Sequence, residues 1–184
     1  MKIVGIDPSL TGTGIAVIDG DIRTYYATNT GTTVVNGDIK TYTIRSKQRG
    51  AKRLIEIRDT IQKEIADADL VVIENYAYCR ANQAHQIGEL GGIIRVLLTE
   101  SGVKWTTVAP AQLKKFATGK GNTKKEHILQ QAYKRWGVEC RTSDEADAFV
   151  LAKIGQALVE DVELTKFQKE VIERLKGERC ENSN

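Results

Sequence analysis

The chain has 184 residues, three cysteines and a formal net charge of +3. This length predicts one compact domain with a core large enough to need no disulfide or structural metal. No apolar run approaches the roughly 18 residues of a membrane span, and the first residues carry no signal-peptide pattern. The cysteines, Cys79, Cys140 and Cys180, are far apart with no CxxC pair, which argues against a disulfide framework or a zinc site and predicts a reducing cytoplasm.

Positive charge is concentrated in one segment. Between Lys104 and Arg135 the chain has eight Lys or Arg residues and one acid, Glu126, a net +7 that leaves −4 on the remainder. A basic segment on an otherwise acidic body predicts a surface for a large anion, with nucleic acid the first candidate. A solvated helical face would give the same pattern, and charge alone does not separate the two.

The first predicted strand ends in a carboxylate. Residues 3–6 form a short, mostly β-branched run that is followed by Asp7 and Pro8. Because Pro8 has no N–H and pushes Asp7 toward an extended conformation, the strand should loosen there. A segment rich in Gly, Ser and Thr then leads into a second strand at residues 12–18. An aspartate in such a place commonly only caps a turn, so Asp7 alone decides nothing.

The next segment predicts an antiparallel meander and a surface helix. Residues 38–45 read as a strand, another is expected near 22–27, and Asn36-Gly37 is a hairpin-turn signal. Residues 49–66 have apolar side chains at helical spacing with Lys and Arg on the other face, which predicts a surface helix.

A second buried strand also ends in an acid. Residues 70–73 are a continuous apolar run of strand length, and Glu74 follows them. A helix is expected over residues 82–100, whose three glycines lower helix propensity by about 1 kcal/mol each. We therefore expect close packing along this helix, against either the sheet or a second subunit.

The remaining chain alternates one strand with several helices. The expected elements are a strand at 105–108, a short helix after Pro110, a helix at 124–136 with Thr123 and Glu126 as capping box, a buried helix at 144–160 that begins at Ser143 or Asp144, a helix at 163–176, and a disordered tail from 178. Strands first, then parallel strands alternating with helices, predict a mixed α/β sheet with helices on both faces. Residues 1–160 are expected to form the main domain, and 161–184 a C-terminal helix and tail.

Two further acids open the long buried helix. Asp144 and Asp147 are three residues apart, so they share one helix face near the end that favours negative charge. Such a pair often has no other role. Together with Asp7 and Glu74, and without a nearby Cys or His set, it predicts a site for a hard cation such as Mg²⁺. Two such ions could clamp the attacking water and the leaving oxygen of a phosphodiester, so the acids and the basic segment predict a nuclease.

Four segments in this order, DPSLTGTG, VVIEN, PAQLKKFATGKGNTKKE and DEADAFVLA, resemble the RuvC family of Holliday-junction resolvases. The resemblance covers about residues 2–155 and implies an α/β, ribonuclease-H-like fold, with a five-stranded mixed sheet flanked by helices on both faces. It also implies a metal-dependent, structure-specific DNA endonuclease that acts as a homodimer on Holliday junctions, with two Mg²⁺ or Mn²⁺ ions per active site. As in phage members of the family, other branched DNA is a further substrate class, and the location is the cytoplasm of a bacterial cell or phage-infected host.

The resemblance also assigns site residues. The family's metal-binding acids match Asp7, Glu74, Asp144 and Asp147, and the lysine near the scissile phosphate matches Lys125. The residues expected to contact DNA are Lys114, Lys115, Lys120, Lys124, Tyr76, Tyr78 and Arg80. The family's junction-stacking aromatic falls on Ala77, between the two tyrosines, and the opening loop is one residue shorter than the family pattern, so selectivity for junctions depends on one of the tyrosines taking that place.

The sequence leaves other functions open. GIDPSLTGTGIAVID also resembles the first phosphate loop of actin-like sugar kinases and ATPases, although these need a second such domain. A module that binds branched DNA without cutting it has no need of four mutually repelling acids. A ribonuclease H acting on RNA/DNA hybrids, or a packaging nuclease, uses similar acids, and the basic segment 110–125 favours the resolvase over both.

Overall fold

The computed structural model describes residues 1–20, 38–75 and 81–181. Its strands and helices are β1 (Lys2–Asp7), β2 (Thr13–Asp19), β3 (Asp38–Ile44), α1 (Gly50–Ile65), β4 (Leu70–Glu74), α2 (Ala81–Glu100), β5 (Trp105–Val108), α3 (Pro110–Thr118), α4 (Lys125–Trp136), α5 (Ser143–Val159) and α6 (Lys166–Glu181). The strand expected near 22–27 and the turn at Asn36-Gly37 lie outside the described residues.

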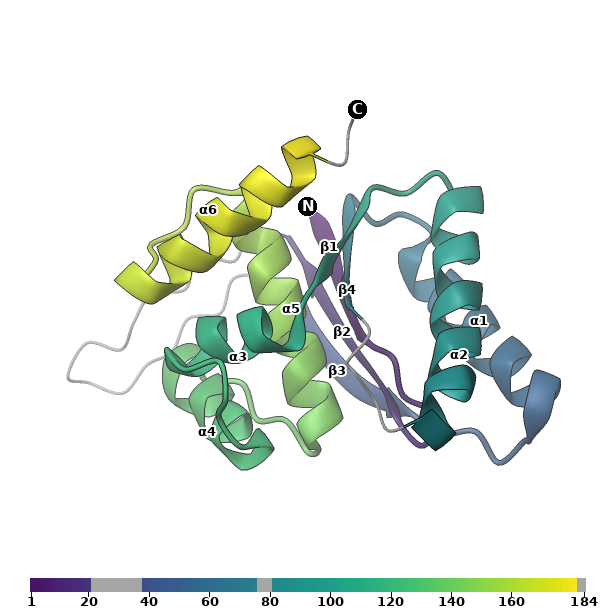
Figure 1. Ribbon diagram of the computed structural model, residues 1–184. Coiled ribbons are helices and arrows are strands. Elements are labelled where there is room, and N and C mark those ends of the chain that lie inside the picture. The colour runs from purple at the N-terminus through teal and green to yellow at the C-terminus, as the bar shows by residue number, and fades with distance from the viewer. Residues whose placement is uncertain (21–37, 76–80, 182–184) are drawn as a thin grey trace.

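The five strands form one mixed sheet in the order β3-β2-β1-β4-β5. The pairs β1–β2 and β2–β3 are antiparallel, whereas β1–β4 and β4–β5 are parallel. Helices α1 and α2 cover one face of this sheet, and α5 covers the other together with α3, α4 and α6 (Figure 1). The predicted α/β sheet with helices on both faces is confirmed.

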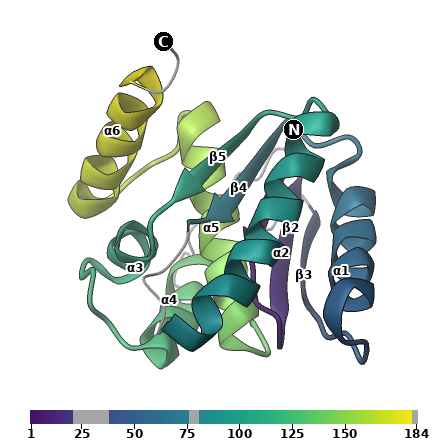
Figure 2. The ribbon, with the colours of Figure 1, turned by 45° about the vertical axis from the view of Figure 1, so that its right-hand side comes forward.

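Side-chain alternation along the central strands separates two cores. Val4 and Ile6 of β1 pack with the apolar stripes of α1 and α2, whereas Ile3 packs on the α5 side. This follows from the period of two in a strand, where successive side chains point to opposite faces. Figure 2 shows α2 lying over the sheet, with α5 behind the strands. None of the helices in the described ranges is both long and apolar enough to cross a membrane.

Helix α5 lies directly on the backbone of β1 and β2. A Cβ atom added at Gly5 would lie 2.0 Å from the carbonyl oxygen of Ala148, and one added at Gly14 would lie 2.0 Å from that of Asp144. Every α5 residue from Glu145 to Ala157 is buried. Because only glycine permits so close an approach, these two positions fix the distance and the axial position of α5 on the sheet.

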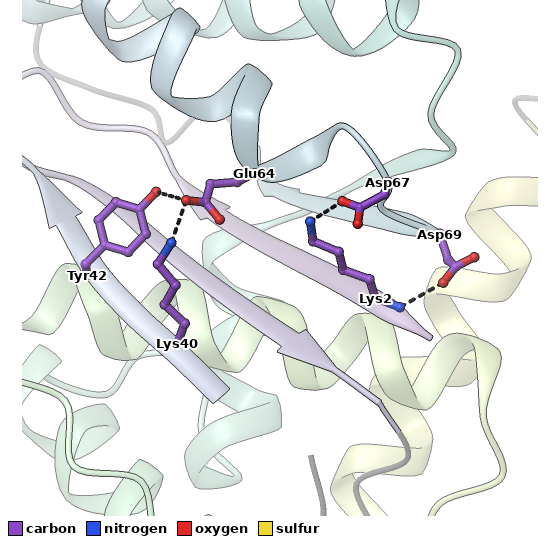
Figure 3. Close-up of polar contacts among 6 residues, drawn as sticks. All are labelled: Lys2, Lys40, Tyr42, Glu64, Asp67 and Asp69. Atoms are coloured by element: carbon purple, nitrogen blue, oxygen red, sulfur yellow. Dashed lines mark hydrogen bonds and ion pairs between the residues drawn. The ribbon is translucent and has the colours of Figure 1, made fainter. Parts of the chain in front are cut away.

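Polar contacts join α1 and the segment after it to the strands (Figure 3). Glu64 accepts hydrogen bonds from the Tyr42 hydroxyl at 2.8 Å and from Lys40 Nζ at 2.7 Å. The backbone N–H of Lys2 donates to Asp69 at 2.7 Å, and the Lys2 ammonium donates to Asp67. The Glu64 contacts tie α1 to β3, and the Asp67 and Asp69 contacts tie the segment after α1 to the start of β1.

The structure corrects the expected start of α4. Thr123 does not cap this helix: the N-cap is Lys124, without a side-chain cap. The Thr123 hydroxyl instead lies 3.1 Å from Nδ1 of His127. The capping box with Glu126 is therefore wrong, because Thr123 precedes the N-cap by one residue and its hydroxyl is engaged elsewhere.

The C-terminal helix is longer than expected. Helix α6 continues to Glu181, so a helix end at 176 and a disordered tail from 178 are wrong as far as 181. The inner face of α6 packs into the core through Val171, Ile172 and Leu175. Gln112 of α3 donates to Glu178 at 3.2 Å, which holds the last turn in place.

Two of the three α2 glycines, Gly88 and Gly92, do not pack on the sheet as one alternative required, whereas Gly91 is buried. A Cβ atom added at Gly88 or Gly92 would meet no atom of the described chain within 4 Å. The second alternative, a contact with another subunit, stays a prediction.

We expect Gly5→Ala to destabilise the protein by about 1–3 kcal/mol or to prevent folding, because the added methyl group overlaps the backbone of α5. Chemical denaturation checks this. Gly177→Ala is the matched control, since a Cβ atom there meets nothing within 4 Å and alanine raises helix propensity by roughly 1 kcal/mol. Equal stability of the two variants would contradict the close approach of α5.

Candidate active site

Two of the predicted acids meet because their strands are parallel neighbours. Asp7 ends β1 and Glu74 ends β4, and the register pairs Ile6 with Ile73 directly before them. The carboxyl ends of parallel strands lie at the same edge of a sheet. The structure therefore brings these two side chains together, close enough to share a hydrogen bond when one of them is protonated.

The other two acids reach this edge through α5. Its first turn lies against Gly14, and Gly14 pairs with Asp7 across β1 and β2. Asp144 and Asp147 therefore face the ends of β1 and β4, close enough for their charges to act on Asp7 and Glu74. With a spacing of three residues on α5, both acids lie on the helix face that is turned toward Lys125.

Burial and mutual repulsion raise the pKa values of Asp7, Glu74 and Asp147. Asp7 and Asp147 are each 5% exposed. Burial, followed by the charge of Asp7, raises the pKa of Asp147 to about 7. Burial and the charge of Glu74 raise the pKa of Asp7 well above its usual range, and burial also raises that of Glu74. A proton or a cation is therefore needed to neutralise this site near pH 7.

Lys125 supplies one positive charge to the cluster. As the first residue of α4, it places Nζ 3.6 Å from Oδ1 of Asp144 and 3.8 Å from Oδ2 of Asp147. Partial burial lowers the pKa of Lys125, but the charges of Asp147, Asp7 and Asp144 outweigh it and raise that pKa overall. Lys114 of α3 is also near enough to act on Glu74 and Asp147.

The remaining predicted DNA contacts are spread more widely. Lys115 pairs with Glu170 of α6 at 2.8 Å, away from the acids. Lys120 and Lys124 are exposed in the segment that joins α3 to α4. The other three, Tyr76, Tyr78 and Arg80, lie outside the described residues, so their roles stay predictions.

The acids suit a hard cation, although they do not form a closed ligand shell. Among residues 1–20, 38–75 and 81–181, no three Asp, Glu, His or Cys side chains are gathered as a ready-made metal group. Oδ1 of Asp147 is buried and has no hydrogen-bond partner within the same residues. Four carboxylates without a thiol or imidazole match the oxygen preference of Mg²⁺ and Mn²⁺. The donor set therefore fits a divalent cation.

Sequence reasoning missed a second group of polar residues beside the acids. Glu145, Thr142 and Thr43 are hydrogen-bonded to one another directly behind Asp144. Glu145 carried a signal, as an acid inside a helix that is otherwise apolar at its middle. Thr43 carried none, because nothing in β3 indicates which helix end will lie over it.

Comparisons with known proteins show which family this chain resembles. The family model described as crossover junction endodeoxyribonuclease RuvC matches residues 3–154. A protein of that name from Synechococcus sp. (strain CC9311) is 26% identical over 159 residues, which cover 84% of this chain and 98% of that protein. One from Mycobacterium avium (strain 104) is 26% identical over 159 residues, covering 83% of this chain and 79% of that protein.

Solved structures share the fold. RuvC of Thermus thermophilus has a TM-score of 0.63 at 23% identity, covering 83% of this chain and 91% of that one. The fowlpox virus resolvase in complex with Holliday junction DNA has a TM-score of 0.54 at 12% identity, covering 87% of this chain and all of that one. These likenesses confirm the predicted ribonuclease-H-like fold.

The family match covers most of the chain and contains all four acids, Lys125 and all of the sheet except Lys2. It stops short of α6 (Lys166–Glu181). The chain belongs to the RuvC family of crossover junction endodeoxyribonucleases.

Proposed function

We propose that this protein is a metal-dependent endonuclease that cuts four-way DNA junctions. The observation that carries the proposal is the meeting of Asp7, Glu74, Asp144 and Asp147 with Lys125 at one edge of the sheet. Family membership supports the reaction, and one Thermus thermophilus RuvC structure, matched with a TM-score of 0.63, is a complex with a Holliday junction substrate. Other branched DNA is the second substrate class that we propose.

The four acids would hold the divalent cations, two Mg²⁺ or Mn²⁺ ions in our proposal. When bound, such ions activate water and stabilise charge on the leaving oxygen of a phosphodiester. In the hydrolysis, an oxygen of water bonds to phosphorus while one P–O ester bond breaks. The strand is then divided into one end that keeps the phosphate and one that carries a hydroxyl.

The cationic side chains supply the rest of the site. Lys125 lies between the acids and solvent, with its side chain 56% exposed, so it is placed to bind the phosphate whose negative charge builds up during attack. Lys114, Lys120 and Lys124 are the proposed contacts to the DNA backbone near the acids, and Lys115, beside Glu170 of α6, is a proposed contact further away. We propose residues 1–160 as the nuclease domain and 161–184 as a C-terminal addition. The proposed location of the protein is the cytoplasm.

We further propose that the protein acts as a homodimer, because two sites related by a two-fold axis suit the symmetry of a four-way junction. Helix α2 offers a surface for this contact. Gly88, Gly92 and Val96 share one face of α2, the Val96 side chain is 56% exposed, and neither glycine packs on the described chain.

Cleavage of labelled DNA tests the function. We expect symmetric cuts in a four-way junction with Mg²⁺ or Mn²⁺ and none with EDTA. Glu74→Gln should lower the rate on the order of 10³-fold or more, as for one member of a catalytic set. Three-way, flap and linear duplex DNA are run beside it. Cuts in every branched form would mean that the substrate class includes branched DNA in general. Tight junction binding without any cut would contradict the nuclease and favour a binding module.

The raised pKa of Asp147 predicts a pH-dependent stability without metal. A carboxyl with a pKa of about 7 when folded and near 3.9 when unfolded binds more protons in the folded state between these values. Its contribution to the free energy of unfolding therefore falls as pH rises from 4 to 7. In Asp147→Asn the side chain cannot ionise, so this fall in the free energy of unfolding with rising pH is absent.

In EDTA, we expect Asp147→Asn to raise the melting temperature at pH 8 by several degrees, at roughly 2–4 °C per kcal/mol, and to change it little at pH 4. Thermal melts at the two pH values measure this. Adding Mn²⁺ at pH 8 should stabilise the unaltered protein more than the variant. An equal change in melting temperature at both pH values would contradict the raised pKa of Asp147.

The dimer is tested by light scattering of the full chain. We expect Val96→Asp to weaken self-association on the order of 10-fold or more, since it places a charge in the proposed contact. Val159→Asp is the matched control, because Val159 is similarly exposed, at 46%, on α5. A monomeric unaltered protein, or equal effects of both substitutions, would argue against the α2 contact.

A further inference from the structure

Glu145 is a buried acid that the proposed reaction does not use. It is 5% exposed and lies between Asp144 and Asp147 in sequence. Its Oε2 accepts a hydrogen bond from the backbone N–H of Arg141 at 3.0 Å, and its Oε1 accepts one from the Thr43 hydroxyl at 3.3 Å. Both oxygens are therefore occupied by neutral donors of the protein itself.

Three of the hydrogen bonds close into a ring. The backbone N–H of Glu145 donates to Oγ1 of Thr142 at 3.2 Å. The Thr142 and Thr43 hydroxyls are 2.9 Å apart. Since the single proton of Thr43 goes to Glu145, Thr142 must be the donor to Thr43. We call Glu145, Thr142 and Thr43 the Glu145 ring; it joins strand β3 to the first turn of α5.

The ring lies directly behind the acids. A Cβ atom added at Gly12 would lie 2.9 Å from the Thr43 methyl group and 3.1 Å from Oδ2 of Asp144. The side chains of Thr43 and Asp144 therefore both lie close to the backbone of Gly12. Thr43 also pairs with Gly14, which lies against the carbonyl of Asp144. A shift of Thr43 or of the first turn of α5 therefore moves Asp144, and with it Asp147 one turn further on.

We propose that Glu145 is a positioning residue: through Thr43 and Thr142 it sets where α5 presents Asp144 and Asp147 to the divalent cation. The inference rests on the proposed function and deepens it. Groups that orient metal ligands from behind typically alter metal affinity 10–100-fold when they are removed. Glu145 itself is not proposed as a ligand, because its two oxygens already accept hydrogen bonds.

The chemistry of the ring separates positioning from simple charge. In Glu145→Gln the amide can keep the ring with reversed direction: its NH₂ group donates to Thr43, Thr43 donates to Thr142, and its oxygen still accepts from Arg141. Glu145→Ala leaves the donors of Arg141 and Thr43 unpaired. Thr43→Val keeps the shape of the side chain and removes only the hydroxyl. A role of the negative charge would make the Gln and Ala variants equally weak.

The experiment is a calorimetric titration of the full-length protein with Mn²⁺, without DNA. We expect Thr43→Val and Glu145→Ala to raise the dissociation constant by about 10–100-fold, and Glu145→Gln to stay within a few-fold of the unaltered protein. Thr41→Val is the matched control, two residues earlier on the same face of β3. Thermal melts in EDTA confirm that each variant is folded.

Junction cleavage gives a second measurement. The rate of Thr43→Val should recover at high Mn²⁺ concentration, since its defect is in metal affinity and not in the chemical step. Binding of Mn²⁺ to Thr43→Val as tight as to the unaltered protein, or a Glu145→Gln variant as weak as Glu145→Ala, would overturn the positioning role alone. Failure of the unaltered protein to bind Mn²⁺ would instead overturn the proposed function, and this inference with it.

Discussion

The contact of α5 with the backbones of β1 and β2 is the constraint on which the rest of the structure depends. Gly5 and Gly14 let the helix approach so closely that its carbonyl groups occupy the space of a side chain. This approach brings Asp144 and Asp147, in the first turn of α5, to the ends of β1 and β4, and the buried stretch behind them forms the core with α3 and α4. Geometry at backbone level, more than any single side-chain contact, gives the acids their relative positions.

The same packing holds acidic groups together against their repulsion. Burial and neighbouring charges raise the pKa values of Asp7, Glu74 and Asp147, so the folded chain carries an electrostatic cost that protons, the nearby lysines Lys125 and Lys114, or a divalent cation relieve. The free energy gained by burying the large apolar core offsets this cost. Such a site favours cation binding because folding already holds the like charges close together.

The sequence indicated the parts of the site that follow from local pattern. Asp7 and Glu74 stand at the ends of apolar runs, and Asp144 and Asp147 are spaced for one helix face, so strand and helix periodicity sufficed to group them. Glu145 and Thr43 could not be paired in this way, because their hydrogen bond joins segments about 100 residues apart. Thr123 was misread as a cap since the choice between neighbouring cap positions depends on the side chains that surround the helix start. The end of α6 depends on its contact with Gln112, which no local signal reveals.

The order of the elements along the chain has a consequence for protein synthesis. Asp7 is made at the start and Asp147 only after 140 further residues, and the α5-facing side of β1, β2 and β4 stays uncovered until α5 exists. Domains fold as units once their sequence is complete. A chain that ends before Asp144 therefore has two of the four acids of the proposed site and no α5 to complete it. The site can form only after α5 has been made.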